Sequence, residues 1–111
     1  MTALRPTEDQ CEDTIIDAAK LAGWRVHVER RSRTKDGWAT AIKGHKGWPD
    51  MTLAHPDGRL IVVELKRKPN KPTPDQEAWL STLRACGVDA RIVWVPEELD
   101  ALLSEITGVS R

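Results

Sequence analysis

The chain has 111 residues, 17 basic and 17 acidic side chains, and a formal net charge of zero. This length predicts one domain over residues 1–111, with a modest core and no separate recognition module. We find no apolar run long enough for a membrane span and no signal-peptide pattern, so we expect a cytoplasmic protein. Two cysteines predict no disulfide framework, and three scattered histidines do not have zinc-site spacing.

The N-terminal part of the chain predicts a helix followed by a strand. Thr7 and Gln10 have the spacing of a capping box, which opens a helix over residues 8–22. Residues 24–28 alternate as in a strand. Residues 30–47 are rich in charge and glycine, and we expect a long loop without regular structure. Such a loop in a compact domain usually has a function.

Two further strands are expected over residues 50–54 and 59–66, joined by a turn at residues 55–58. The second strand is β-branched and apolar in its centre, and it ends in Glu64-Leu65-Lys66. With a period of two, Glu64 and Lys66 share one face of this strand. Pairing across the turn brings Asp50 towards the level of Glu64 and Lys66.

The C-terminal part predicts helix, strand and helix. Thr73 and Gln76 form a second capping-box pattern with Pro74 at the first helical position, which opens a helix over residues 74–86. A strand over residues 90–95 and a short closing helix follow. The order αβββαβα predicts an α/β fold with a central mixed sheet flanked by helices, in which a parallel crossover joins the last two strands.

The convergence of Asp50, Glu64 and Lys66 predicts a specific chemistry. Carboxylates bind hard Mg²⁺ or Mn²⁺ through oxygen and leave positions open for phosphate and water. A lysine beside them stabilises developing negative charge or orients the attacking water. Glu64-Leu65-Lys66 alone would also fit a surface strand with alternating charges, but the Pro49-Asp50 pair at this spacing favours a metal site that cleaves a phosphodiester.

Basic side chains are concentrated in the centre of the sequence. Residues 25–71 hold twelve basic and five acidic side chains, whereas both flanking segments are acidic. Such a concentration indicates binding to a phosphate backbone, although ordinary solvated loops are the alternative. Trp38 and Trp48 are candidates for stacking on an unpaired base, or for anchoring a loop to the core. The predicted nucleic-acid-binding residues are Arg30, Arg31, Arg33, Lys35, Lys46, Arg67 and Lys68.

Two helix starts offer additional site residues. Gln76 is explained as a cap, but it also projects from the buried stripe towards the sheet, where the site carboxylates are possible partners. Glu8 and Glu12 lie four residues apart on one helix face, so either acid can lean towards Asp50. Acids in a first turn also complement the helix dipole without any further role.

The residues Gly47-Trp48-Pro49-Asp50, Glu64-Leu65-Lys66 and Gln76, the last on a helix that continues with Trp79-Leu80, resemble the PD-(D/E)XK nuclease superfamily. They resemble more closely its small virus-type replication-repair (VRR-NUC) nuclease domains of phages and bacteria, and the resemblance extends from about residue 7 to residue 94. It implies a restriction-endonuclease-like core.

The resemblance also implies roles for individual residues. Asp50 and Glu64 would bind the metal, Lys66 would be catalytic, and Gln76 would support the site. The family places its first-helix acid directly after the capping Ser or Thr, which favours Glu8 over Glu12 as a further metal ligand.

We therefore expect a Mg²⁺- or Mn²⁺-dependent DNA endonuclease without an organic cofactor or a membrane partner, and the resemblance implies that it is structure-selective for branched or Holliday-junction-like DNA. A homodimer is expected, because a domain of this size spans too little DNA to cut two strands symmetrically. The alternative is a non-catalytic nucleic-acid-binding module with the same fold. The intact set of Asp50, Glu64 and Lys66 argues against that alternative, because binding alone does not require carboxylates near phosphate.

Overall fold

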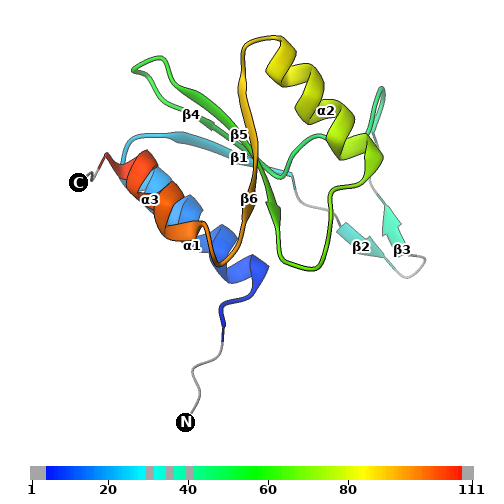
Figure 1. Ribbon diagram of the computed structural model, residues 1–111, viewed down its shortest axis with the longest axis horizontal. Helices are drawn as coiled ribbons and strands as arrows, with labels where there is room; N and C mark the ends of the chain where they lie inside the picture. The colour runs from blue at the N-terminus through cyan, green and yellow to red at the C-terminus, as the bar shows by residue number, and fades with distance from the viewer. Residues whose placement is uncertain (1–4, 30–31, 35–36, 40–41, 109–111) are drawn as a thin grey trace.

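The computed structural model describes residues 5–29, 32–34, 37–39 and 42–108 (Figure 1). The expected helices and strands are all present, with ends that differ from the prediction by a few residues. One expectation was wrong: the segment 30–47 contains a short β-hairpin. The elements in chain order are α1 (Glu8–Leu21), β1 (Arg25–Val28), β2 (Ser32–Thr34), β3 (Gly37–Ala39), β4 (Met51–Ala54), β5 (Leu60–Lys66), α2 (Pro74–Ala85), β6 (Asp89–Trp94) and α3 (Leu99–Thr107).

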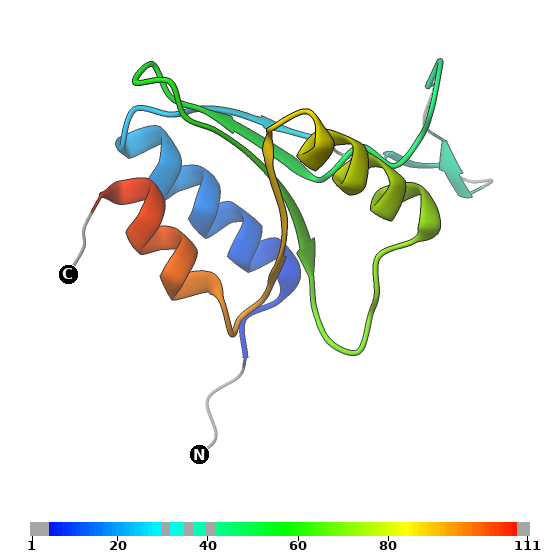
Figure 2. The same ribbon diagram turned by 45° about the horizontal axis from the view of Figure 1, so that its top comes forward.

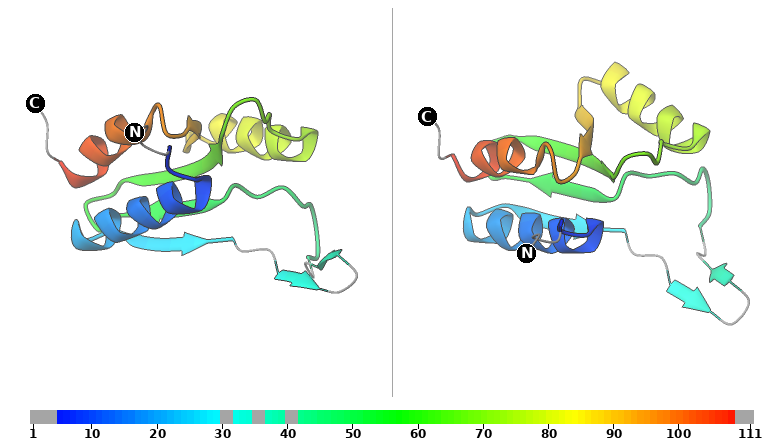
Figure 3. Two further views of the ribbon diagram at one scale, coloured as in Figure 1. Left: turned by 90° about the horizontal axis from the view of Figure 1, so that it is seen from below. Right: turned by 60° about the horizontal axis from the view of Figure 1, so that its bottom comes forward.

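The main sheet has four strands in the order β1-β4-β5-β6. β4 pairs antiparallel with both β1 and β5, whereas β5 and β6 are parallel, so the predicted mixed sheet is confirmed. β2 and β3 form a separate two-stranded sheet, which lies to one side of the main sheet (Figure 3). No helix among the described residues is long and apolar enough to cross a bilayer.

Helices cover both faces of the main sheet. Because side chains alternate along β5, Ile61, Val63 and Leu65 face one side and Val62 the other. The first set packs into a core with buried residues of α1 and α3. Val62 packs instead with Leu80 of α2. The sheet therefore separates a larger core under α1 and α3 from a smaller one under α2.

Capping boxes fix the starts of α1 and α2. Thr7 Oγ1 accepts a hydrogen bond from Gln10 N at 3.0 Å, and Thr7 N donates to Gln10 Oε1 at 2.8 Å. Thr73 and Gln76 repeat this exchange at the start of α2. Figures 1 and 2 show the N-terminal end of α1 beside the carboxyl end of β5. The cap therefore places the first turn of α1 where Glu64-Leu65-Lys66 ends.

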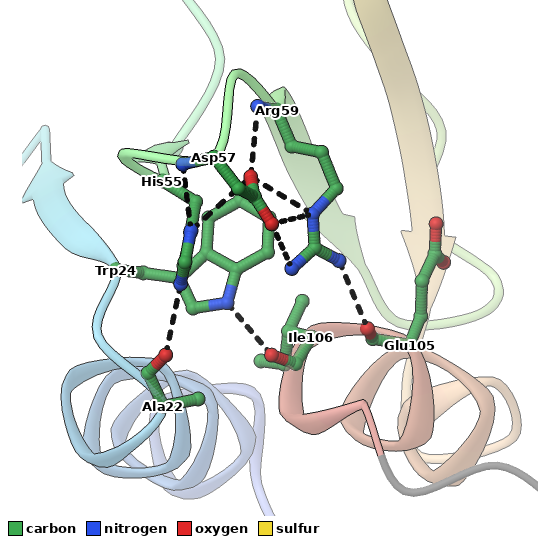
Figure 4. A network of polar contacts seen from close by, with 7 residues as sticks. All are labelled: Ala22, Trp24, His55, Asp57, Arg59, Glu105 and Ile106. Carbon is green, nitrogen blue, oxygen red and sulfur yellow. Dashed lines mark hydrogen bonds and ion pairs between the residues drawn. The ribbon is translucent and has the colours of Figure 1, made fainter.

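The opposite end of the β4–β5 hairpin is held by a polar network around Trp24 (Figure 4). Trp24 Nε1 donates to the carbonyl oxygen of Ile106 at 2.7 Å. His55 meets the indole edge to face at 5.1 Å, and the Arg59 guanidinium lies 4.7 Å from the ring centroid. Asp57 accepts from Arg59 Nε at 2.9 Å and lies 2.8 Å from its Nη2. This network, here named the turn cluster (Trp24, His55, Asp57 and Arg59), ties the hairpin turn to α1 and α3.

Candidate active site

Asp50 and Glu64 are brought together by the register of β4 and β5. Met51 pairs with Val63 at the end of the antiparallel register, so Asp50, directly before β4, and Glu64, the next residue of β5, face each other across the two strands. Asp50 Oδ2 accepts a hydrogen bond from Leu65 N at 2.9 Å, which fixes the carboxylate at the end of β5. The expectation that strand pairing brings Asp50 to the level of Glu64 and Lys66 is confirmed.

Glu64 is a buried carboxyl group with an incomplete set of partners. The residue is 1% exposed, and its Oε1 has no hydrogen-bond partner. Its Oε2 lies 3.5 Å from Lys66 Nζ, at the limit of a direct interaction. Burial raises the pKa of Glu64 to about 8, the Asp50 charge adds to the rise, and the Lys66 ammonium opposes it. The site therefore holds two neighbouring carboxyl groups with too little positive charge to ionise both easily.

The first turn of α1 contributes Glu8. Its side chain is partly buried, and burial raises its pKa, with a further rise from the Asp50 carboxylate and an opposing effect of Lys66. Glu8 is therefore close enough to Asp50 and Lys66 for their charges to act on it. Glu12 is also partly buried and lies one turn further along the helix. The choice between Glu8 and Glu12 as a metal ligand stays a prediction.

Gln76 is buried, as expected for a residue that faces the sheet, and is 8% exposed. Its Oε1 accepts from Thr73 N at 2.9 Å, and its backbone N–H donates to Thr73 Oγ1 at 3.2 Å. The side-chain oxygen is thus used by the capping box of α2. The contribution of Gln76 to a catalytic site stays a prediction.

Some of the predicted phosphate-binding residues already interact within the protein. Arg67 Nη1 donates to the carbonyl oxygen of Pro6 at 2.6 Å, which fastens the segment before α1 to the end of β5. Lys46 Nζ lies 3.6 Å from Asp75 Oδ2 at the start of α2. Lys68 is exposed. The structure thus gives Arg67 a partner that the sequence did not predict, because no local pattern links Arg67 to Pro6.

The rest of the predicted DNA-binding set lies in the segment around β2 and β3. Arg30, Arg31 and Lys35 lie outside the described residues, and so do the side chains of Arg33 and Trp38. Their proposed contacts with nucleic acid stay predictions.

Trp48, for which the sequence left two roles, serves here as an anchor. Its Nε1 donates to Thr52 Oγ1 at 3.2 Å, and its ring meets Trp79 edge to face at 5.0 Å. Trp79 Nε1 in turn donates to the carbonyl oxygen of His45 at 3.2 Å. Trp79 and Gly47 were not among the predicted site residues. Gly47 could have been found, because a glycine directly before Trp48-Pro49-Asp50 is a signal that the backbone approaches another segment closely there.

The residues present fit a divalent cation. The unpaired Oε1 of Glu64 is a buried acceptor, and a cation bound between Glu64 and Asp50 would favour the ionised form of both. Carboxylate oxygens are the ligands that Mg²⁺ takes, and Mg²⁺ keeps several positions for water and phosphate. Among the residues that the structure describes, no group of three or more His, Cys, Asp or Glu side chains is placed to hold a metal ion, so the fit rests on the pair of Asp50 and Glu64.

Comparisons with known proteins agree with this architecture. No curated protein matches the chain. A solved structure described as a VRR-NUC domain matches with a TM-score of 0.65 and 22% sequence identity, over 87% of this chain and 94% of the other. At that identity the match shows a shared fold. The profile of the VRR-NUC domain matches residues 8–97, which include Asp50, Glu64, Lys66 and the starts of α1 and α2. The chain therefore belongs to the VRR-NUC domain family, whose members are nuclease-fold modules.

Proposed function

We propose that the protein is a metal-dependent DNA endonuclease that hydrolyses phosphodiester bonds and selects branched DNA. The observation that carries this proposal is the buried pair of Asp50 and Glu64, with an unpaired oxygen on Glu64 and Lys66 beside it. Such a pair is unfavourable for folding, because burial and the neighbouring Asp50 disfavour ionisation of Glu64 and the buried Oε1 lacks a partner. Groups of this kind indicate a functional site.

The proposed chemistry assigns a role to each charged group. Asp50 and Glu64 would hold the metal ion, with Glu8 as a further ligand from α1. The bound ion would supply an activated water and polarise the scissile phosphate. Lys66 is the one residue of this set that carries positive charge, and its side chain is only 15% exposed. Its ammonium would stabilise the negative charge that develops on the phosphate, or orient the attacking water.

Specificity for branched DNA is supported by the arrangement of charge around the site. Arg67 and Lys68 directly follow the catalytic strand, and Lys46 lies shortly before Asp50. The β2–β3 hairpin lies to one side of the main sheet, where it would reach a second duplex arm (Figure 3). We further propose a homodimer, whose twofold axis would give two sites for a symmetric junction.

One cleavage experiment tests this function. Purified protein is incubated with linear duplex, single-stranded, flap and four-way-junction DNA, with Mg²⁺, Mn²⁺, Ca²⁺ or EDTA. We expect cleavage of branched DNA with Mg²⁺ or Mn²⁺, and binding without turnover in Ca²⁺, which has a looser coordination geometry. Lys66→Ala should lower turnover by about 100-fold or more while DNA affinity stays close to that of the wild type.

Three outcomes would each contradict a part of the proposal. Full activity in EDTA would remove the metal from the mechanism. DNA binding without cleavage under every metal condition would favour the non-catalytic nucleic-acid-binding module instead. Equal cleavage of linear and branched DNA would leave the endonuclease in place and remove only the selectivity.

A further inference from the structure

The loop before β4 lies directly against the first turn of α2, and Gly47 is the point of contact. Its φ is +102°, a conformation that residues with side chains rarely adopt. A Cβ built on Gly47 would lie 2.6 Å from the carbonyl carbon of Asp75, 2.7 Å from its oxygen and 2.9 Å from its Cβ. The first two atoms are backbone, so no rotamer change of Asp75 relieves this overlap. Any side chain at position 47 must therefore push the loop away from α2.

Interactions on both sides of Gly47 hold the same contact. Trp79 Nε1 donates to the carbonyl oxygen of His45 at 3.2 Å, and Lys46 Nζ lies 3.6 Å from Asp75 Oδ2. On the other side, Trp48 packs edge to face on Trp79 with 5.0 Å between the ring centroids. We name this set of contacts between residues 45–48 and α2 the loop brace.

The loop brace leads directly to Asp50. Trp48 also donates from its Nε1 to Thr52 Oγ1 in β4. Pro49, which lies between Trp48 and Asp50 in the chain, is fully buried. Proline has a fixed φ, so little freedom separates Trp48 from the carboxylate residue. Asp50 then bonds Leu65 N through its side chain and accepts from Glu29 N through its carbonyl oxygen. The position of Asp50 therefore depends on α2 through the loop as well as on the neighbouring strands.

We propose that Gly47 is a positioning residue for Asp50: because it has no side chain, the first turn of α2 holds the loop where the Asp50 carboxylate faces Glu64. This inference rests on the proposed function, since it names a residue that sets the geometry of the same metal site. Its consequence is that a displacement of the loop at Gly47 weakens metal binding at Asp50, which lies on a different element from α2.

Gly44 provides a matched control for the test. It lies in the same loop and also has a positive φ, +91°, but an added Cβ would meet nothing within 4 Å. Gly44→Ala and Gly47→Ala therefore impose similar backbone strain, and only Gly47→Ala adds the overlap with Asp75. A third variant, Trp79→Phe, keeps an aromatic ring against Trp48 and removes the hydrogen bond to His45.

We expect Gly47→Ala to raise the Mg²⁺ concentration for half-maximal cleavage by about tenfold or more, the range seen when supporting contacts of a metal ligand are lost. Turnover at saturating Mg²⁺ should fall by up to about 100-fold, while KM for DNA changes little. Gly44→Ala should stay close to the wild type in all three quantities. Trp79→Phe should shift the Mg²⁺ requirement in the same direction as Gly47→Ala, by a smaller factor.

Amide NMR spectra of the metal-free protein give a readout that does not depend on activity. Gly47→Ala should shift the amide signals of Asp50 and Met51 as well as those of Asp75 and Gln76, and Gly44→Ala should leave all four in place. Equal Mg²⁺ requirements and equal spectra for the two alanine variants would overturn the inference. If the wild type does not cleave DNA, the proposed function fails, and the spectra alone decide whether the loop brace positions Asp50. If Gly47→Ala does not fold, Trp79→Phe carries the same comparison.

Discussion

The two ends of the β4–β5 hairpin arrange charged side chains in opposite ways. At the turn, Asp57 is paired with Arg59, and the hydrogen bonds from Arg59 hold the pKa of Asp57 below its usual range. At the other end, Asp50 lies opposite Glu64, and burial together with the Asp50 charge raises the pKa of Glu64. One pair of strands thus carries a paired acid and base at one end and, at the other, two neighbouring carboxyl groups of which Glu64 has an unpaired Oε1.

The difference separates stability from function within one hairpin. The turn cluster joins the hairpin to α1 and α3 through interactions that are complete without any ligand (Figure 4). At the other end, Glu64 Oε1 is buried without a hydrogen-bond partner. Arrangements that are unfavourable for folding are characteristic of functional sites. Substitutions at the two ends should therefore have opposite effects on stability and on activity.

The largest effect is expected for Glu64→Gln. Loss of the charge should lower cleavage by more than about 100-fold, because the metal would lose a ligand. In EDTA, the same substitution should raise the free energy of unfolding near neutral pH by about 1–3 kcal/mol, because Glu64, whose pKa is raised in the folded protein, ionises on unfolding and glutamine does not. Urea unfolding near neutral pH, with and without Mg²⁺, measures both consequences.

Added Mg²⁺ provides the internal control for that comparison. It should stabilise the wild type against urea and leave Glu64→Gln nearly unchanged, since only the protein that binds the ion gains stability from it. A destabilised Glu64→Gln protein in EDTA would show that the buried carboxyl group supports the fold by itself, and the contrast between the two ends would then be wrong.

Trp24→Phe should produce the opposite result at the turn end. It leaves the carbonyl oxygen of Ile106 without the donor that now lies 2.7 Å away, in a buried position. We expect the free energy of unfolding to fall by about 1–3 kcal/mol. Cleavage, measured well below the midpoint of thermal unfolding, should stay within about twofold of the wild type, because the carboxylates proposed to bind the metal lie at the far end of the strands. A loss of Mg²⁺-dependent cleavage without a loss of stability would contradict this separation.

A smaller effect on the metal site is expected from Arg67→Ala. Arg67 holds the carbonyl oxygen of Pro6, directly before the first turn of α1, and its charge acts on Glu8. We expect Mg²⁺ affinity to fall by about tenfold, since a contact that supports a ligand is lost. In a Glu8→Gln background the same substitution should have little further effect, so that the double-mutant cycle shows coupling between Arg67 and Glu8.

Lys68→Ala is the control for Arg67. This neighbour is exposed, so its removal should weaken DNA binding and reduce the salt slope by about one, without changing Mg²⁺ affinity. If Arg67→Ala behaves like Lys68→Ala and shows no coupling to Glu8, Arg67 is a DNA contact and not a support for α1.

The features that the sequence predicted are those determined by local patterns. The start of α1 follows from Thr7 and Gln10, three residues apart, and β5 follows from its β-branched centre. The meeting of Asp50 and Glu64 was predictable because a short turn fixes the register of the strands it joins. The family resemblance was carried by the same short motifs and is confirmed by the profile match.

The features that the sequence did not predict depend on contacts between distant segments. The hairpin of β2 and β3 lies in a segment where charge and glycine hide any alternation of apolar residues. Nothing near Arg67 indicates Pro6 as its acceptor, and nothing near Gly47 indicates Asp75 as its neighbour. These contacts follow from the packing of helices against the sheet, which sequence periodicity does not specify.

The smallest predicted effect concerns Glu105 on α3, an acid near the turn end. Hydrogen bonds from Arg91, at 2.6 and 2.8 Å, lower the pKa of Glu105 from its usual value near 4.5. A lowered pKa in the folded state means that this stabilisation is present above the unfolded pKa and is lost as the pH falls through the folded pKa. Near neutral pH we expect Glu105→Gln to lower the free energy of unfolding by about 0.5 kcal/mol, because the side chain is 44% exposed and solvent screens the pair. At about pH 3 the difference from the wild type should shrink towards zero, which urea unfolding at the two pH values would measure.

Asp17→Asn, at an exposed position of α1, is the control, and its difference in stability from the wild type should not change between the two pH values. A difference for Glu105→Gln that stays constant with pH would mean that the substitution acts through packing, and Arg91 would then not contribute to the turn end by its charge.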